Sequence, residues 1–189
     1  MPKDRWAAAV LAHPHPSFGG DMHSAVTQWL FDELPRQGIV AVRFNFRGVG
    51  QSGGDHDEGR GERLDVVAAL ELADMFVQGP IVLAGYSFGA DVSLCVVHPS
   101  VSGWYAIAPP LRTASTEMVA ARDVRPKQIV AAEHDQFTHF DTARSLTADW
   151  TNTRVEEIAG GDHFLAGRLS VVADGCVDFA RSLAASEAR

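Results

Sequence analysis

A serine with a glycine two positions away on each side lies near the middle of the chain, in the segment Gly85-Tyr86-Ser87-Phe88-Gly89. The apolar run 81–84 precedes this segment and the apolar run 90–97 follows it. Where a strand turns into a helix, the G-x-S-x-G pattern holds the serine on a sharp, strained corner and exposes its hydroxyl group. The next N–H then lies at a helix N-terminus, where an anionic oxygen is favoured. The pattern predicts that Ser87 is a nucleophile.

Two other glycine patterns overlap in the segment 48–54. Residues 50–54 also fit G-x-S-x-G around Ser52, but the polar residues 55–59 follow them instead of an apolar helix. Residues 48–53 fit the dinucleotide-binding pattern G-x-G-x-x-G, which needs a following helix and an acidic residue about 20 positions further on. Gly53 leads into an acidic loop instead, and position 73 is an alanine. We therefore interpret the segment as a glycine-rich turn and predict no dinucleotide site.

A serine hydroxyl needs a base to take its proton, and the base needs a third group to fix its tautomer. Among the eight histidines, His163 is the preferred base because it follows the predicted strand 154–158 and precedes the last helix. The preferred acid is Asp135, which comes after the predicted strand 128–132. His134 also follows that strand, but it neighbours Asp135. The order Ser87, Asp135, His163 thus runs along successive strand ends.

Alternatives for the acid stay open: Asp123, Asp141 and Asp162. Asp162 adjoins His163, and sequence neighbours seldom present their side chains to each other in a turn. Among the other histidines, His98 ends a predicted helix and so belongs to the opposite edge of the sheet. We expect His56 and His139 to be solvated loop residues.

Attack by a serine also requires donors for the oxyanion that forms in the transition state. One donor is expected to be the N–H of Phe88, and the other to come from the loop 13–20 after the first predicted strand. Because Pro14 and Pro16 have no N–H, the N–H of His15 is the first choice. The alternatives in this loop are the N–H groups of Ser17 and Phe18.

His13 and His15 alternate in a way that also suggests a pair of metal ligands. No third ligand stands at a spacing typical of metal sites, so we predict neither a metal nor a cofactor. We expect the imidazole of His13 to form hydrogen bonds within its own loop.

The elements that must position these residues alternate along the chain. Short apolar runs predict six strands, at 7–12, 39–46, 81–85, 103–108, 128–132 and 154–158. Helical periodicity predicts helices within 22–34, 64–77, 88–97, 140–150 and 165–183. This alternation favours a doubly wound α/β sheet, in which ligands bind beyond the carboxyl ends of the strands. The irregular stretches 48–61 and 109–126 are too short for a second domain, so residues 1–189 form one domain.

Composition excludes several classes of protein. The chain has 189 residues, and its 16 basic and 24 acidic residues give a net charge of −8, which disfavours nucleic acids and anionic membranes as partners. No apolar run approaches the roughly 18 residues of a membrane span, and we expect a cytoplasmic protein. Cys95 and Cys176 are too few for a disulfide framework and are expected to be small buried hydrophobes.

The order of elements, the segment 85–89, Asp135 and Gly161-Asp162-His163 together resemble the α/β-hydrolase superfamily over nearly the whole chain. Residues 13–16 (HPHP) and 44–53 (FNFRGVGQSG) are similar to a small bacterial branch related to dienelactone-hydrolase-like and prolyl-oligopeptidase-like hydrolases. The resemblance implies a minimal α/β-hydrolase fold of about six mostly parallel strands with helices on both faces. It also implies site roles: a Ser87, Asp135, His163 triad, backbone donors at His15 and Phe88, and a structural turn at Arg47 and Gly48.

The chain departs from the family pattern in two places. The usual first two antiparallel strands are expected to be absent, and the stretch 109–126 is too short for a lid. Dienelactone hydrolases carry a cysteine where this chain has Ser87, so their substrate is not carried over.

We therefore predict a lidless serine hydrolase that cleaves small or accessible esters through an acyl-enzyme on Ser87, with a small-molecule acyl substrate. A peptidase, thioesterase or acyltransferase would use the same triad, and a non-catalytic binding protein with this fold is the alternative of a different class. Several aromatic residues are candidates for a pocket, although aromatics at such spacings are more often core: Tyr86, Phe88, Trp104, Tyr105, Phe137 and Phe164.

Overall fold

The computed structural model describes residues 2, 4–112 and 117–187. Its strands are β1 (Ala7–Ala12), β2 (Ile39–Arg43), β3 (Ile81–Tyr86), β4 (Gly103–Ile107), β5 (Lys127–Ala132) and β6 (Thr153–Ile158). Its α-helices are α1 (Ala25–Glu33), α2 (Glu62–Asp74), α3 (Phe88–Leu94), α4 (Phe140–Leu146) and α5 (Leu169–Glu187). Short 3₁₀ helices are η1 (Pro16–Phe18), η2 (Leu34–Gln37) and η3 (Val119–Arg122). All six predicted strands are therefore present.

The strands form one sheet in the order β2-β1-β3-β4-β5-β6, and every pair in the described part of the chain is parallel. The chain first winds outward from β1 to β2, then returns to β3 and continues the other way. The winding thus reverses beside β1 and β3, which is where such sheets bind ligands.

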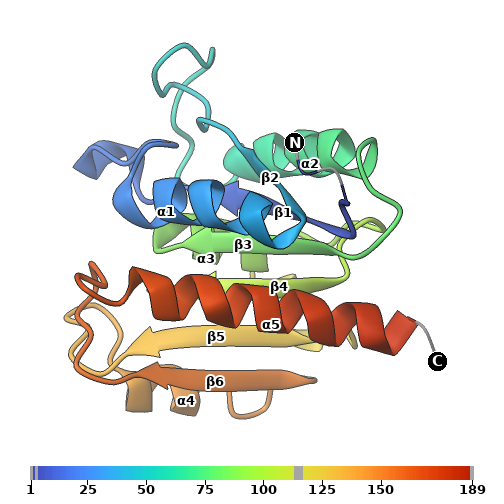
Figure 1. Cartoon of the computed structure of the whole chain (residues 1–189). Coiled ribbons are helices and arrows are strands. Elements are labelled where there is room, and N and C mark those ends of the chain that lie inside the picture. Colours follow the sequence, from blue (N-terminus) through green and yellow to red (C-terminus); the bar gives the residue numbers. More distant parts are fainter. Residues whose placement is uncertain (1, 3, 113–116, 188–189) are drawn as a thin grey trace.

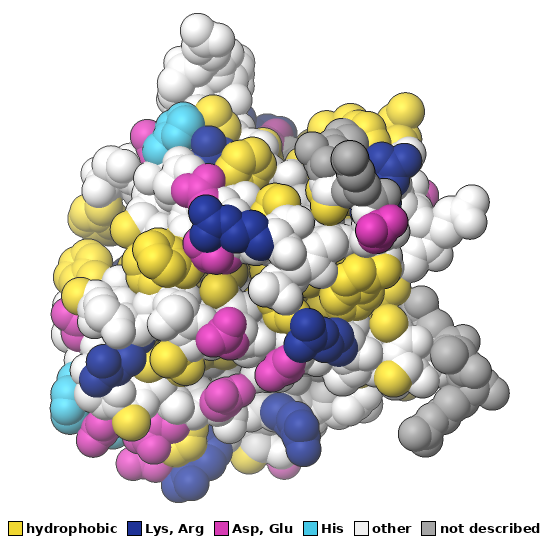
Figure 2. Space-filling view, viewed as in Figure 1, with side chains coloured by type: hydrophobic (Ala, Val, Ile, Leu, Met, Phe, Trp, Pro, Cys, Tyr) yellow, Lys and Arg dark blue, Asp and Glu magenta, His cyan; other side chains and the backbone are white. Residues whose placement is uncertain are grey.

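Helices cover both faces of the sheet, with α1 and α5 on the face toward the viewer (Figure 1). Side chains alternate between the two faces of the sheet along each strand, so each face has its own hydrophobic core. In β1, Ala7, Ala9 and Leu11 belong to the core under α1 and α5. The intervening β1 residues pack with α2, α3 and α4 on the opposite face. Acidic and basic side chains are interspersed over the α1 and α5 face (Figure 2).

The main difference from the predicted boundaries is at β2, which ends at Arg43 instead of residue 46. Arg43 pairs with Leu11, next to the last residue of β1, so the sheet offers little further pairing beyond it. The chain instead bends over the sheet edge and buries Phe46, whose N–H donates to His13 Nε2 at 3.0 Å. An apolar residue here thus marks a buried turn rather than a longer strand.

The stretch 109–126 follows β4, where other α/β sheets insert larger segments. Its residues 113–116 lie outside the described part of the chain, and the rest hold only the short helix η3. Among the described residues, no helix has both the length and the apolar character needed to cross a membrane. Cys176 is buried as predicted, whereas Cys95 is only half-buried.

Candidate active site

Ser87 occupies the corner between β3 and α3. Its φ of 53° lies in the left-handed region, which costs a residue with a Cβ on the order of 1–3 kcal/mol. The glycines on either side permit this corner, because a Cβ on Gly85 would lie 2.3 Å from the Gly89 carbonyl oxygen. A Cβ on Gly89 would lie 2.4 Å from the carbonyl oxygen of Ala12, in β1. Close approach of strand and helix therefore fixes the serine at this point.

Three side chains that follow β3, β5 and β6 form a continuous chain of hydrogen bonds. Ser87 Oγ lies 3.0 Å from His163 Nε2, and His163 Nδ1 lies 2.8 Å from Asp135 Oδ2. All three residues are buried. The carboxylate favours a proton on Nδ1 and leaves the lone pair of Nε2 directed at the serine hydroxyl. This arrangement can remove the proton of Ser87 as the oxygen attacks an electrophile.

Asp135 is held in place by its own loop after β5. Its second carboxylate oxygen, Oδ1, accepts hydrogen bonds from the N–H groups of Phe137 at 2.8 Å and Thr138 at 3.1 Å. The other aspartates considered from the sequence have different surroundings. Asp123 pairs with Arg125, which lowers the pKa of Asp123 to about 2, and Asp141 is exposed at the start of α4.

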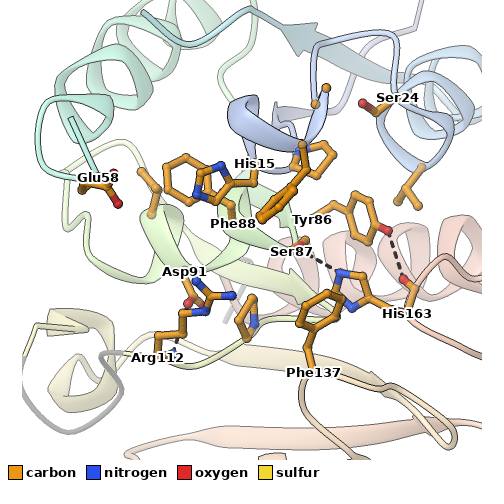
Figure 3. Close-up of a pocket in the computed structure, with 18 of the residues that line it drawn as sticks. His15, Ser24, Glu58, Tyr86, Ser87, Phe88, Asp91, Arg112, Phe137 and His163 are labelled. Carbon is orange, nitrogen blue, oxygen red and sulfur yellow. Dashed lines mark hydrogen bonds between the residues drawn. The ribbon is translucent and has the colours of Figure 1, made fainter. Parts of the chain in front are cut away.

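The loop of His163 follows β6 and is tied to the end of β3 and to the loop after β5. The hydroxyl of Tyr86 donates to the carbonyl oxygen of His163 at 3.0 Å (Figure 3). The N–H of His134 donates to the carbonyl oxygen of Gly161 at 2.8 Å, which joins the loops after β5 and β6. The sequence analysis missed this use of Tyr86, since the pattern G-x-S-x-G sets no requirement on that residue.

The loop after β1 contains the two alternating histidines, and they have different roles. His13 is buried, with Nδ1 2.7 Å from the Pro14 carbonyl oxygen and Nε2 accepting from the Phe46 N–H. Both ring nitrogens of His13 therefore form hydrogen bonds, which gives this histidine a structural role. His15 lies instead at the pocket wall, and its ring packs against Phe88 with centroids 4.7 Å apart.

A pocket of about 680 Å³ opens beside Ser87, and most of its lining is apolar (Figure 3). Four of the six aromatic residues considered from the sequence line it: Tyr86, Phe88, Phe137 and Phe164. Trp104 and Tyr105 are buried in the core instead. The pocket wall also carries His15 and Glu58, from the loops after β1 and β2.

Asp91 is a partly buried carboxylate in the pocket wall that the sequence analysis did not consider. It accepts hydrogen bonds from the N–H groups of Leu111 at 2.9 Å and Arg112 at 3.2 Å, and so ties α3 to the loop after β4. Burial raises the pKa of Asp91 to about 6 despite these two bonds. Its contacts are with backbone groups of the pocket wall.

Near the glycine-rich turn, the turn at Arg47 and Gly48 agrees with the sequence prediction, whereas His56 does not. Arg47 forms a bidentate pair with Asp65, and Gly48 has a φ of 74°, so this segment is a held turn. His56 was expected to be solvated, and this is wrong. Both of its ring nitrogens are shielded from solvent, because the loop folds against Glu62 of α2.

Comparisons with known proteins agree with this geometry. A family model described as an alpha/beta hydrolase domain matches residues 6–175. The uncharacterized protein RP471 of Rickettsia prowazekii is 31% identical over 170 residues, covering 82% of this chain and 71% of that protein.

Solved structures give the same result. An alpha-beta serine hydrolase homologue from Coxiella burnetii is 32% identical, with a TM-score of 0.82 over 94% of this chain and 87% of that one. XC6422 from Xanthomonas campestris, a serine hydrolase without a lid, is 26% identical, with a TM-score of 0.81 over 95% of this chain and 84% of that one. By its sequence, its sheet and its corner serine, the chain belongs to the α/β-hydrolase family.

Proposed function

We propose that the protein is a serine hydrolase that cleaves small or accessible carboxylic esters. The observation that carries the proposal is the hydrogen-bonded chain from Ser87 through His163 to Asp135 at the floor of an apolar pocket. Holding a buried serine on a strained backbone corner costs stability. An imidazole 3.0 Å from its hydroxyl oxygen can activate that oxygen as a nucleophile.

The reaction proceeds in two steps in this proposal. His163 Nε2 takes the hydroxyl proton while Ser87 Oγ attacks the acyl carbon, and the imidazolium then protonates the departing alcohol. Asp135 holds the ring and stabilises its positive charge. Water enters, gives its proton to His163 and attacks the acyl-enzyme, which releases the carboxylic acid and restores the serine.

The proposed oxyanion donors are the N–H groups of Phe88 and His15. The Phe88 N–H belongs to the first turn of α3, so it has no acceptor within the helix. His15 comes from the loop after β1, the strand adjacent to β3, and lines the same pocket. Loss of one such donor typically lowers kcat by about 10²–10³-fold.

The proposed substrate size follows from the pocket and from what covers it. A volume of about 680 Å³ is in the usual range for small-molecule sites. The described residues of 109–126 hold only η3, and the similar protein XC6422 is a hydrolase without a lid. An open apolar pocket suits short acyl groups, because a long chain would leave much of its surface in water.

Activity on a series of p-nitrophenyl esters tests this proposal. We expect kcat/KM to be highest for short acyl chains and to fall for long ones, with no activity in Ser87→Ala. Matching thioesters and peptide amides, assayed together, separate an esterase from a thioesterase or a peptidase. A clear preference for long-chain esters, or for amides over esters, would contradict the proposed substrate class.

A further inference from the structure

Three side chains with metal-ligating atoms meet at the pocket wall, and none of them belongs to the chain of Ser87, His163 and Asp135. His15 comes from the loop after β1, whereas His56 and Glu58 come from the loop between β2 and α2. One ligand atom from each lies within 4.8 Å of the others, and His56 Nε2 is 3.7 Å from Glu58 Oε1. We propose that this cluster binds a divalent transition-metal ion, with Zn²⁺ as the best match to two imidazoles and one carboxylate.

His56 provides the strongest support for a ligand at this position. Both ring nitrogens are shielded from solvent; Nδ1 lies 2.7 Å from Glu62 Oε1, whereas Nε2 has no hydrogen-bond partner in the described part of the chain. Polar atoms in such positions are normally satisfied, so Nε2 calls for an explanation. A metal ion on Nε2 would supply the missing partner.

A buried carboxylate stands behind His56, as it does behind many metal-binding histidines. Glu62 has a fully buried side chain, and its Oε1 lies 2.7 Å from His56 Nδ1. The N–H groups of Asp57 and Gly59 donate to the two oxygens of Glu62 at 2.8 and 2.9 Å, which fixes the carboxylate. Its negative charge favours the proton on Nδ1 and leaves the lone pair of Nε2 for a metal, and such outer partners tune metal affinity.

The cluster needs only small movements to close around an ion. Zn–N distances of about 2.0–2.1 Å place tetrahedral ligand atoms roughly 3.3–3.5 Å apart, so the present separations of up to 4.8 Å must shrink by at most about 1.5 Å. The Glu58 side chain is 78% exposed and free to make this movement. His15 would have to give up the hydrogen bond that its Nδ1 accepts from the Ser17 N–H, which is long at 3.2 Å and exposed.

The local electrostatics also favour a cation. Glu58 and Glu62 bring two carboxylates to the site. Three protein ligands leave a fourth position open, and His15 and Glu58 both line the pocket. The inference does not depend on the proposed esterase function, because the cluster uses no side chain of the serine site.

Metal binding by purified, metal-free protein tests the inference. Zn²⁺ is titrated in competition with a chromophoric chelator, and Co²⁺ is followed by its visible d–d absorption. We expect wild type to bind one ion per chain and to give the intense spectrum of four-coordinate Co²⁺. His56→Ala and Glu58→Gln should weaken Zn²⁺ binding by at least about 10–100-fold, the range seen even for outer-shell changes.

Two control variants separate this site from other histidines. His134→Ala removes an exposed imidazole that lies 4.0 Å from a glutamate, Glu133, but belongs to no cluster of three possible ligands among the described residues. His163→Ala removes the imidazole beside Ser87. Both should bind Zn²⁺ as wild type does.

Two results would overturn the inference: no stoichiometric Zn²⁺ binding by wild type, or equal binding by wild type, His56→Ala and Glu58→Gln. Glu58 is exposed, so Glu58→Gln should stay folded even if His56→Ala does not. Loss of binding only in His163→Ala would also contradict it, because the ion would then belong to the serine site.

Discussion

Two turns of this protein carry the same G-x-S-x-G letters and have little else in common. At the first, Ser52 Oγ donates to the carbonyl oxygen of Asn45 at 2.8 Å, and the Ser52 N–H donates to Val49. At the second, the Ser87 N–H donates to the carbonyl oxygen of Ile107 in β4, and its Oγ faces an imidazole. Ser52 thus stabilises its own loop, whereas Ser87 links β3 to β4 and to the loop after β6.

The difference shows which part of the pattern has a physical cause. Gly89 is needed because a Cβ there would meet the carbonyl oxygens of Ala12 and His13 at 2.4 and 2.5 Å. In the first turn the corresponding glycine is Gly54, where a Cβ would meet only the Cβ of Arg47, at an ordinary contact distance of 3.5 Å. The G-x-S-x-G pattern predicts a nucleophile only where the backbone is crowded between a buried strand and a helix, because that crowding produces the strained corner at the serine.

The largest expected effect separates the two serines by activity. Ser87→Ala should lower kcat for ester hydrolysis by about 10⁵–10⁶-fold, because the nucleophile is lost. Ser52→Ala should keep kcat within about two-fold and lose stability by about 1 kcal/mol, since only a local hydrogen bond is removed. Steady-state kinetics and thermal unfolding measure both. Comparable loss of activity in the two variants would contradict the conclusion that only Ser87 acts in catalysis.

Gly89 and Gly53 give a test of crowding, with Gly53 as an open position in the other turn. Gly89→Ala should lower the free energy of unfolding by about 3 kcal/mol, because the new methyl group meets backbone that cannot move aside easily. Gly53→Ala should change it by less than about 0.5 kcal/mol, because the site is open. Urea unfolding of both variants measures the difference. If Gly89→Ala were as stable as Gly53→Ala, the corner would not be crowded.

Asp91, in the helix that follows the Ser87 corner, adds a pH dependence. Burial raises the pKa of Asp91 from 3.8 to about 6 in the folded protein, so the folded state binds the proton more tightly than the unfolded state. Its contribution to stability is therefore largest below about pH 4 and declines by on the order of 2–3 kcal/mol as the pH rises through 6.

The comparison of wild type with Asp91→Ala isolates this contribution. The difference in free energy of unfolding between the two proteins should shrink as the pH rises from 4 to 7. Urea unfolding at several pH values measures it. A difference that stays constant over this range, or grows, would rule out a buried Asp91 carboxyl that titrates near pH 6.

The smallest expected effect concerns Tyr86, whose hydroxyl holds the loop of His163. Tyr86→Phe should cost about 1 kcal/mol of stability and lower kcat a few-fold, because one buried hydrogen bond is lost and the imidazole is less well placed. Tyr105→Phe is the control, since its hydroxyl also donates to a backbone carbonyl at 3.0 Å, in Val172. It should lose similar stability at unchanged kcat. Equal kcat in the two variants would mean that Tyr86 is only structural.

Much of the fold could be predicted from the sequence because its causes are local. Short apolar runs between polar loops identified all six strands, and the β1 boundaries agree with the prediction. The end of β2 could not be predicted, because it depends on where the neighbouring strand stops. An apolar residue such as Phe46 can either extend a strand or fill a buried turn, and the sequence alone does not distinguish the two.

The candidate site, too, was predictable from the sequence only in part. Strand ends of a parallel sheet meet at one edge, so Ser87, Asp135 and His163 could be grouped from their order alone. The contact of Tyr86 with His163 joins residues 77 positions apart and leaves no mark in either segment. The shielding of the His56 ring nitrogens depends on how its loop folds against the buried Glu62, and the polar sequence of the loop does not indicate it.

A fluorophosphonate probe, followed by intact-mass measurement and peptide mapping, tests the central claim most directly. Such a probe forms a covalent bond with a serine only when that serine is activated. The account predicts one adduct per chain, on Ser87, in wild type and in Ser52→Ala, and none in Ser87→Ala. A folded wild-type protein that stays unlabelled, or an adduct on Ser52, would contradict it.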